Sequence, residues 1–318
     1  MRVGQNPAKF VKDVKKPERI TVAVLTYVPF ISGYYAEALD VIKLCLDSLI
    51  ANTDVPHDLM VFDNGSCLEA QDYLRGLKDN GDIQYLLLSD KNLGKGGAWN
   101  ILLSGAPGEI IAYTDSDAYF YSGWLSRSVQ LLETYPRVGM VTARPFRQNE
   151  AWNTNTVKWA EKTRGVKVER GEFITWEDFW DFVRSLGNSE EQAREWYETS
   201  QDIRLTYKNV PAIIGSSHWQ FTAWKKTLQE FLPFDMSRPM GQVRQLDERM
   251  NAAGYLRLMP TQMLAQNMSN RIPDEFRKTV KAAKKRSTKN GFQKMLDTPF
   301  VKNRLLAIYD RIFRWYYD

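Results

Sequence analysis

Apolar runs alternate with amphipathic stretches over the first 145 residues of the chain. Short runs rich in Val, Ile, Leu and Tyr predict strands, at 20–27, 58–63, 83–88, 110–114 and 138–143. Apolar residues at helical spacing between these runs predict helices, at 35–52, 68–79 and 95–104. Because strands alternate with helices, we expect an α/β half with a mostly parallel, Rossmann-like sheet that carries helices on both faces.

The segment 147–209 differs in character, being rich in Trp, Glu and Arg. Thr175 with Asp178, and Ser189 with Gln192, have the spacing of capping boxes, which begin helices. These pairs predict helices over 176–186 and 189–203, and we interpret the segment as a helical insertion or lid.

Beyond the insertion, the pattern returns to strands and helices. Residues 210–231 predict a strand and then a helix, and 245–260 predict a helix, a stop at Gly254 and a short strand. We therefore divide the chain into four parts, at 1–145, 146–209, 210–270 and 271–318.

The positive charge of the chain is concentrated in its last part. The whole chain carries +5, but residues 271–318 hold 13 Lys and Arg against 5 Asp and Glu, or +8, which leaves −3 for the rest. An apolar content of 43% is typical of a globular protein. No run of about 18 apolar residues predicts a membrane-spanning helix. Two cysteines and no signal peptide favour a cytoplasmic protein.

Two carboxylates one residue apart follow the apolar run 110–114. Asp115 and Asp117, separated by Ser116, can together hold one hard cation such as Mg²⁺ or Mn²⁺, which also recruits substrate phosphates. Such a cation neutralises a diphosphate as it leaves. The alternative is a solvated turn, because the triplet D-x-D is common by chance.

Two further segments favour the binding site over the turn. Asp63 begins the turn D-N-G-S at the end of a predicted strand, where its carboxylate can accept hydrogen bonds from a base or a ribose. The glycines of KNLGKGGAWN, residues 91–100, let backbone N–H groups approach phosphate, and Lys91 and Lys95 add positive charge. These glycines do not follow the first strand, which argues against a dinucleotide-binding fingerprint.

Taken in order, these segments resemble the family 2 glycosyltransferases, which have the GT-A fold. The resemblance covers about 100 residues: a first strand ending in Thr-Tyr, a D-[DN]-G-S turn, an N-x-G-x-x-x-A-x-N segment, and D-x-D. The matching residues are Thr26, Tyr27, Asp63, Asn64, Gly65, Ser66, Asn92, Gly94, Ala98, Asn100, Asp115 and Asp117.

The resemblance implies a nucleotide-diphosphate sugar donor, with UDP favoured and GDP and dTDP still open, and Mn²⁺ or Mg²⁺ as cofactor. It implies that 1–145 bind this donor and that 210–270 bind a glycan or lipid-linked acceptor, with inversion at the sugar. It assigns the donor contacts to Thr26, Tyr27, Asp63, Lys91, Asn92, Gly94, Lys95, Asp115 and Ser116, and the metal to Asp117 with Asp115.

The acceptor half departs from the family pattern. The family's base is a carboxylate early in a late helix; here Gln242 and Val243 stand at the expected positions, so Asp247 is the predicted base and Glu248 the alternative. Family members often have a further histidine ligand, which Gln266 and Asn267 replace here. His218 and Trp219 are predicted on the acceptor side, as a hydrogen-bond donor and a stacking surface for a sugar.

The basic tail, 271–318, includes an amphipathic stretch with Val301, Leu305, Ile308 and Ile312 on one helical face. It fits either packing on the body or on a second copy of the chain, or peripheral contact with a membrane surface. No nucleic-acid motif accompanies the charge. Two other functions stay open: a catalytically degenerate GT-A binding or assembly module, and a sugar-phosphate nucleotidylyltransferase, although the latter lacks its glycine-rich loop after the first strand.

Overall fold

The computed structural model describes residues 5–237 and 243–277 together with positions 304, 308 and 311. The strands within these residues are β1 (Ile20–Thr26), β2 (Asp58–Asp63), β3 (Tyr85–Leu88), β4 (Ile110–Asp115), β5 (Ala118–Phe120), β6 (Val138–Val141), β7 (Lys167–Gly171), β8 (Asp202–Tyr207), β9 (Val210–Ile214), β10 (Gln220–Trp224), β11 (Leu256–Met259) and β12 (Ala265–Asn267). The helices are α1 (Ala38–Asn52), α2 (Leu68–Asp79), α3 (Gly94–Gly105), α4 (Trp124–Thr134), α5 (Thr154–Lys162), α6 (Trp176–Ser185), α7 (Glu190–Thr199), α8 (Lys225–Gln229) and α9 (Arg244–Ala252).

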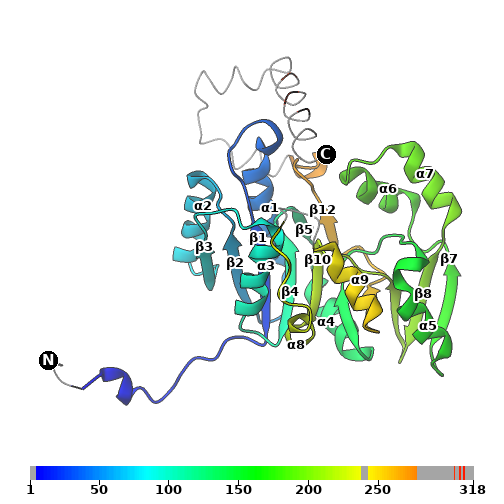
Figure 1. The fold of residues 1–318 in the computed structure, drawn as a ribbon, viewed down its shortest axis with the longest axis horizontal. Coiled ribbons are helices and arrows are strands. Elements are labelled where there is room, and N and C mark those ends of the chain that lie inside the picture. The colour runs from blue at the N-terminus through cyan, green and yellow to red at the C-terminus, as the bar shows by residue number, and fades with distance from the viewer. Residues whose placement is uncertain (1–4, 238–242, 278–303, 305–307, 309–310, 312–318) are drawn as a thin grey trace.

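One large sheet forms the centre of the described part of the chain (Figure 1). Its ten strands lie in the order β3-β2-β1-β4-β10-β6-β11-β9-β8-β7, and a second sheet pairs β12 with β5. Strands β3, β2, β1 and β4 are parallel, as the alternating pattern predicts. Beyond β4 the sheet is mixed, because β10 runs antiparallel to both β4 and β6.

Strands β1, β2 and β4 are buried on both faces, and this explains their apolar runs, whereas β3 lies at the edge of the sheet and is partly exposed. Val22 and Val24 of β1 pack in one cluster with apolar residues of α1, α2 and α4. Ala23 and Leu25 point the other way, into a cluster with residues of α3, α8 and α9. The predicted α/β class, a sheet with helices on both faces, is confirmed.

The segment predicted as a helical insertion, 146–209, contains α6 and α7 near their predicted bounds but also α5 and the strands β7 and β8. The helix expected to reach 203 ends at Thr199, because β8 begins at Asp202 and pairs with β7 and β9. Strand β7 ends the sheet in Lys-Val-Glu-Arg-Gly, a mostly polar edge strand without an apolar run to predict it. The inserted segment therefore extends the main sheet as well as adding helices.

Two buried arginines after β6 hold this segment in place. Arg147 is fully buried and pairs with Asp202 at 3.0 Å, and its guanidinium also donates to the backbone oxygens of Tyr197 and Ser200. Arg144 donates to the backbone oxygen and carboxylate of α6 residues Asp178 and Asp181, at 2.8 and 3.1 Å.

Most of the predicted basic tail lies outside the described residues. Within it, positions 304, 308 and 311 are helical and exposed, while the other residues of the predicted apolar face are not described. No helix in the described ranges combines the length and the apolar character needed to cross a membrane.

We predict that Arg147→Ala lowers the free energy of unfolding by about 3–5 kcal/mol, because it leaves the Asp202 carboxylate buried without its cation. The matched control is Arg170→Ala, which removes exposed pairs with Glu150 and Glu161 and should cost below about 1 kcal/mol. Urea unfolding of both variants tests this, and equal losses would contradict the role of the buried pair.

Candidate functional site

Three of the predicted donor residues end neighbouring parallel strands. In the register of the sheet Thr26 lies beside Asp63, and Leu25 lies beside Asp115. The carboxyl ends of β2, β1 and β4 therefore meet at one edge of the sheet, which is where open α/β sheets bind their ligands. The fold brings the predicted donor residues together there.

Asp63 is fully buried at this edge and already has partners within the chain. One carboxylate oxygen accepts from the Thr26 hydroxyl at 3.0 Å, and the other accepts from the backbone N–H of Ser66 at 3.0 Å and the amide of Gln71 at 3.4 Å. The carboxylate thus fixes the shape of the D-N-G-S turn, and its contact with a base stays a prediction.

The turn after Asp63 is locked to the loop that carries Asn92. The Asn64 side chain donates to the Asn92 side chain at 3.0 Å and accepts from the backbone N–H of Leu93 at 2.9 Å. Gly65, at φ +87°, lies so close that an added Cβ would meet the backbone carbon of Lys91 at 3.0 Å. The two motifs thus form one rigid surface.

The glycines at the start of α3 have different roles. Gly94 adopts φ +67° where the helix begins, and its N–H donates to the Asn92 side chain at 2.8 Å. Gly96 and Gly97 are buried against the segment Asp235–Met236, where a Cβ would approach atoms at 2.8 Å. These two glycines are explained by close packing, and Gly94 by its backbone conformation.

The remaining predicted donor contacts lie around this edge with different exposure. Tyr27 is half-buried and packs edge-on against Tyr35, with ring centroids 6.2 Å apart. Lys91 is exposed, and Ser116 is half-buried between the two aspartates. Their contacts with a donor stay predictions.

Both carboxylate oxygens of Asp115 have partners within the protein. One carboxylate oxygen lies 2.6 Å from the ammonium of Lys95, and the other accepts from the hydroxyl of Tyr113 at 2.5 Å. The Lys95 ammonium also lies over the rings of Trp99 and Tyr113, at 5.6 and 5.9 Å. Burial and the neighbouring Asp115 carboxylate raise the pKa of Tyr113, which keeps its proton available for this bond.

Asp117 is left without such compensation. Its Oδ1 is buried and has no hydrogen-bond partner among the described residues. Burial, and after it the Asp115 carboxylate, raise the pKa of Asp117, Lys95 opposes both, and the pKa is about 7 as a result. A buried carboxylate oxygen without a partner fits a divalent cation, which would supply the missing positive charge.

The rest of such a coordination shell would not come from acidic, histidine or cysteine side chains. Within the described ranges, no group of three or more of these residues could hold a metal ion. Asn267 lies beside Asp117, since Met268 donates its backbone N–H to the Asp117 backbone oxygen at 2.7 Å, but the Asn267 amide oxygen accepts from the backbone N–H of Ser269. Gln266 bonds Tyr121 and Glu275 instead. Two carboxylates suit Mg²⁺ or Mn²⁺, which complete their shells with water and phosphate.

The two predicted acceptor-side groups, His218 and Asp247, are in direct contact. His218 Nδ1 lies 2.5 Å from Asp247 Oδ2, and the second oxygen of Asp247 accepts from Arg257 at 2.6 Å. The alternative base, Glu248, has a side chain that is 68% exposed and lies 3.6 Å from Arg244. The structure therefore favours Asp247 over Glu248 as the residue that faces the site.

Trp219 joins the two sides of the site. Its backbone oxygen accepts from the N–H of Asp115 at 2.9 Å. Its ring is 7% exposed and lies 5.9 Å from the ring of Phe182 in α6, and its indole N–H is buried without a partner in the described part of the chain. The predicted role of Trp219 as a stacking surface for a sugar stays a prediction.

With this geometry in place, comparison with known proteins decides the family. Residues 31–209 match the family model described as glycosyl transferase family 2. The chain belongs to this family. The match includes Asp63, Asp115 and Asp117, and it ends before His218 and Asp247.

Individual relatives are distant. An uncharacterized glycosyltransferase of Nostoc sp. is 29% identical over 112 residues, which are 35% of this chain and 34% of the relative, so the chain spans about a third of that protein. Mannosyltransferase PcManGT from Pyrobaculum calidifontis, in complex with GDP-Man and Mn²⁺, has 18% identity and a TM-score of 0.50, covering 89% of this chain and 68% of that one. S. aureus TarS has 13% identity and a TM-score of 0.46, covering 78% and 36%.

These findings establish the chain as a member of glycosyl transferase family 2, and its fold matches that of a structurally characterised GT-A glycosyltransferase. Membership of family 2 argues against the alternative that the chain is a sugar-phosphate nucleotidylyltransferase. It also explains why the buried charge lies at the carboxyl edge of the parallel strands, because this edge is where the family motifs fall.

Sequence reasoning missed residues that support the site from within strands. Arg257 stands in the short apolar run of β11 and Tyr113 in that of β4, and both are buried. A charged or hydroxyl-bearing residue inside an apolar strand is the pattern that points to such residues, since a buried polar group needs a partner.

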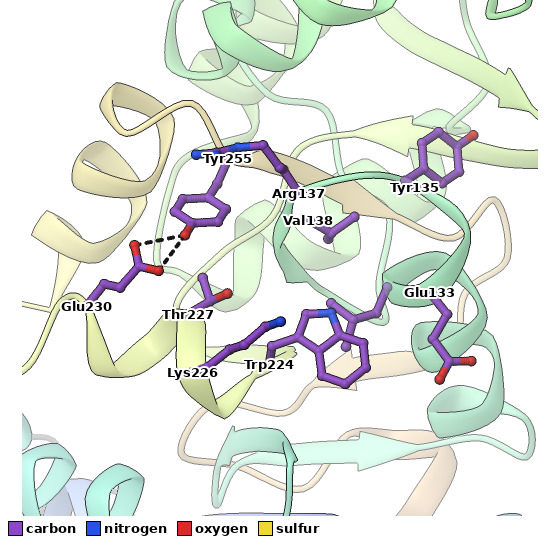
Figure 2. A pocket seen from close by; sticks show the side chains of 10 residues that line it. Glu133, Tyr135, Arg137, Val138, Trp224, Lys226, Thr227, Glu230 and Tyr255 are labelled. Atoms are coloured by element: carbon purple, nitrogen blue, oxygen red, sulfur yellow. Dashed lines mark hydrogen bonds between the residues drawn. The ribbon is translucent and has the colours of Figure 1, made fainter.

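The cavity in Figure 2 is separate from this site. It has a volume of about 720 Å³ and is lined by residues that include Trp224, Arg137 and Tyr255, whose hydroxyl donates to Glu230 at 2.8 Å. Trp224 pairs with Ile110, the first residue of β4, whereas Asp115 is the last. The cavity therefore lies at the opposite end of the strands, and no predicted site residue lines it.

The metal-free protein should lose stability as the pH rises towards about 7. Asp117 has a pKa near 7 in the fold and 3.8 as its ordinary value, so the folded state binds more protons in this window and the free energy of unfolding falls as they leave. Urea unfolding in EDTA at about pH 5 and about pH 8 measures the slope. Asp117→Asn should flatten it, whereas the exposed control Asp79→Asn should not; an unchanged slope in Asp117→Asn would refute the assignment.

Proposed function

We propose that the chain transfers a sugar from a nucleotide-diphosphate donor to a hydroxyl acceptor, with inversion at the sugar and with Mn²⁺ or Mg²⁺ as cofactor. The observation that carries this proposal is the buried, unpartnered oxygen of Asp117 at the carboxyl edge of the parallel strands. Family membership supports the reaction class, and the two carboxylates support the cation.

On this proposal the residues of the edge divide the work. Asp117 and Asp115 hold the cation, which when bound offsets the negative charge of the departing diphosphate. Lys95 orients Asp115, since its ammonium lies 2.6 Å from the carboxylate. The locked loops that carry Asp63 and Asn92 give the donor a rigid wall, which reduces the entropy lost on binding.

The acceptor enters from the other side of Asp115. The Asp247–His218 pair supplies the base for the acceptor hydroxyl. We further propose that 1–145 form the donor half, 210–270 the acceptor half, and α6 with α7 a cover for the acceptor, because Phe182 of α6 contacts Trp219. The acceptor is a glycan or a lipid-linked saccharide, and a role of 271–318 at a membrane surface or in a homo-oligomer stays a prediction.

One observation favours a second function, a degenerate module that binds but does not turn over its donor. The family's further histidine ligand is replaced by Asn267, and the amide oxygen of Asn267 already accepts from Ser269. A weaker metal site would suit binding without catalysis.

A panel of UDP, GDP and dTDP with Mn²⁺, Mg²⁺ or EDTA tests the proposal. We expect one nucleotide diphosphate to stabilise the protein only with metal, by about 2.7 kcal/mol at a hundredfold excess over its Kd. Asp117→Asn should abolish this metal-dependent stabilisation, and Asp79→Asn should retain it.

Turnover separates the two functions. The matching nucleotide-sugars should be hydrolysed slowly by the wild-type protein and not by Asp117→Asn. Metal-dependent stabilisation without any hydrolysis would favour the binding module, and no stabilisation by any nucleotide would overturn both.

A further inference from the structure

The acceptor-side pair rests on one buried cation, Arg257. Its guanidinium donates to the Ser216 hydroxyl at 2.9 Å, the Ser216 backbone oxygen at 2.6 Å, the Trp152 backbone oxygen at 2.9 Å and Asp247 Oδ1 at 2.6 Å. The Arg257 side chain is 3% exposed. Since every terminal nitrogen is bonded to a fixed neighbour, Arg257 fixes the orientation of Asp247.

Both oxygens of the Asp247 carboxylate are engaged in hydrogen bonds. One of its oxygens accepts from Arg257 at 2.6 Å and the other lies 2.5 Å from His218 Nδ1. The side chain of Asp247 is 13% exposed, against 30% for that of His218. The imidazole is therefore the more accessible member of the pair.

The hydrogen bond also defines which nitrogen of His218 is free. An ionised carboxylate only accepts, so Nδ1 carries the proton in the neutral imidazole and Nε2 keeps its lone pair. Nε2 has no hydrogen-bond partner among the described residues. His218 directly precedes Trp219, whose backbone oxygen bonds the N–H of Asp115, so the imidazole belongs to the segment that touches the donor side.

We propose that His218, through Nε2, is the group that takes the proton from the acceptor, and that Asp247 is its positioning residue. The inference rests on the proposed function and refines it. As the acceptor oxygen forms its bond to the anomeric carbon, its O–H bond breaks and the proton moves to Nε2. The bond from the anomeric carbon to the diphosphate breaks and its electron pair leaves with the diphosphate. Asp247 stabilises the imidazolium, which then returns its proton to solvent.

Nitrogen NMR of the histidine side chains tests the geometry without any substrate. The chain has two histidines, so His57→Gln leaves His218 as the one imidazole. At alkaline pH we expect the Nδ1–H tautomer in this variant, and a mixture once Asp247→Asn is added. A predominant Nε2–H tautomer would overturn the proposal, because Nε2 could not accept a proton.

Turnover tests the role itself, with water as the acceptor and the nucleotide-sugar that stabilises the wild-type protein as the donor. His218→Gln should lower kcat for hydrolysis by about 10²- to 10⁴-fold while metal-dependent stabilisation by the nucleotide diphosphate is retained. His57→Gln, the matched control, should be unchanged, since among described residues its ring is hydrogen-bonded only to the Val55 backbone oxygen and lies outside the predicted site.

Chemical rescue distinguishes proton transfer from a structural role. Imidazole in solution should restore part of the hydrolysis of His218→Ala and should not restore Asp247→Ala. Rescue of Asp247→Ala by formate without rescue of His218→Ala by imidazole, or a His218→Gln rate within about threefold of wild type, would assign the base to Asp247. A wild-type protein that neither binds nor hydrolyses any nucleotide-sugar would instead refute the proposed function, even where the tautomer is as expected.

Discussion

The antiparallel pairing of β10 with β4 is the constraint on which the site depends. It sets Gln220 opposite Thr114, so the residues just before β10 lie beside those that end β4. A parallel strand in this position would have carried its first residues to the opposite edge of the sheet. Because β10 is reversed, the backbone of Trp219 bonds that of Asp115, and the residues predicted for the donor and for the acceptor share one edge.

Two aspartates one residue apart are treated differently by the fold. Asp115 receives an ammonium from α3 and a hydroxyl from its own strand, so its charge is compensated within the protein. Asp117 lies past the end of β4 and receives neither, which leaves one of its oxygens buried and unpartnered. The cost of this burial is the reason why the site favours either a proton or a cation at Asp117.

Three buried arginines link the segments that follow β6. Arg144 and Arg147 tie the inserted segment to the end of β6, and Arg257 ties β11 to α9 and to the loop that carries Trp152. A guanidinium can bond several groups at fixed angles, which an apolar side chain cannot do. The inserted helices and the acceptor-side pair are thereby held rigidly beside an edge of the sheet that is built mainly from apolar packing.

The sequence by itself determined the class of the fold, the parallel strands of its first half and the motifs at their carboxyl edge. It could do so because strands buried on both faces are written as continuous apolar runs, and because parallel strands place their carboxyl ends together. The same pattern could not reveal β7, a polar edge strand, or the end of α7, where a strand rather than a turn follows.

Only the tertiary structure decided how the predicted residues are used. It showed Asp63 engaged by Thr26, Ser66 and Gln71, and it joined His218 to Asp247 across 29 positions of the chain. The third member, Arg257, is a single charge in an apolar run, and its role in orienting Asp247 is seen only from its contacts in the structure. Side-chain contacts between distant segments depend on how the sheet is ordered, and local sequence patterns carry no information on that order.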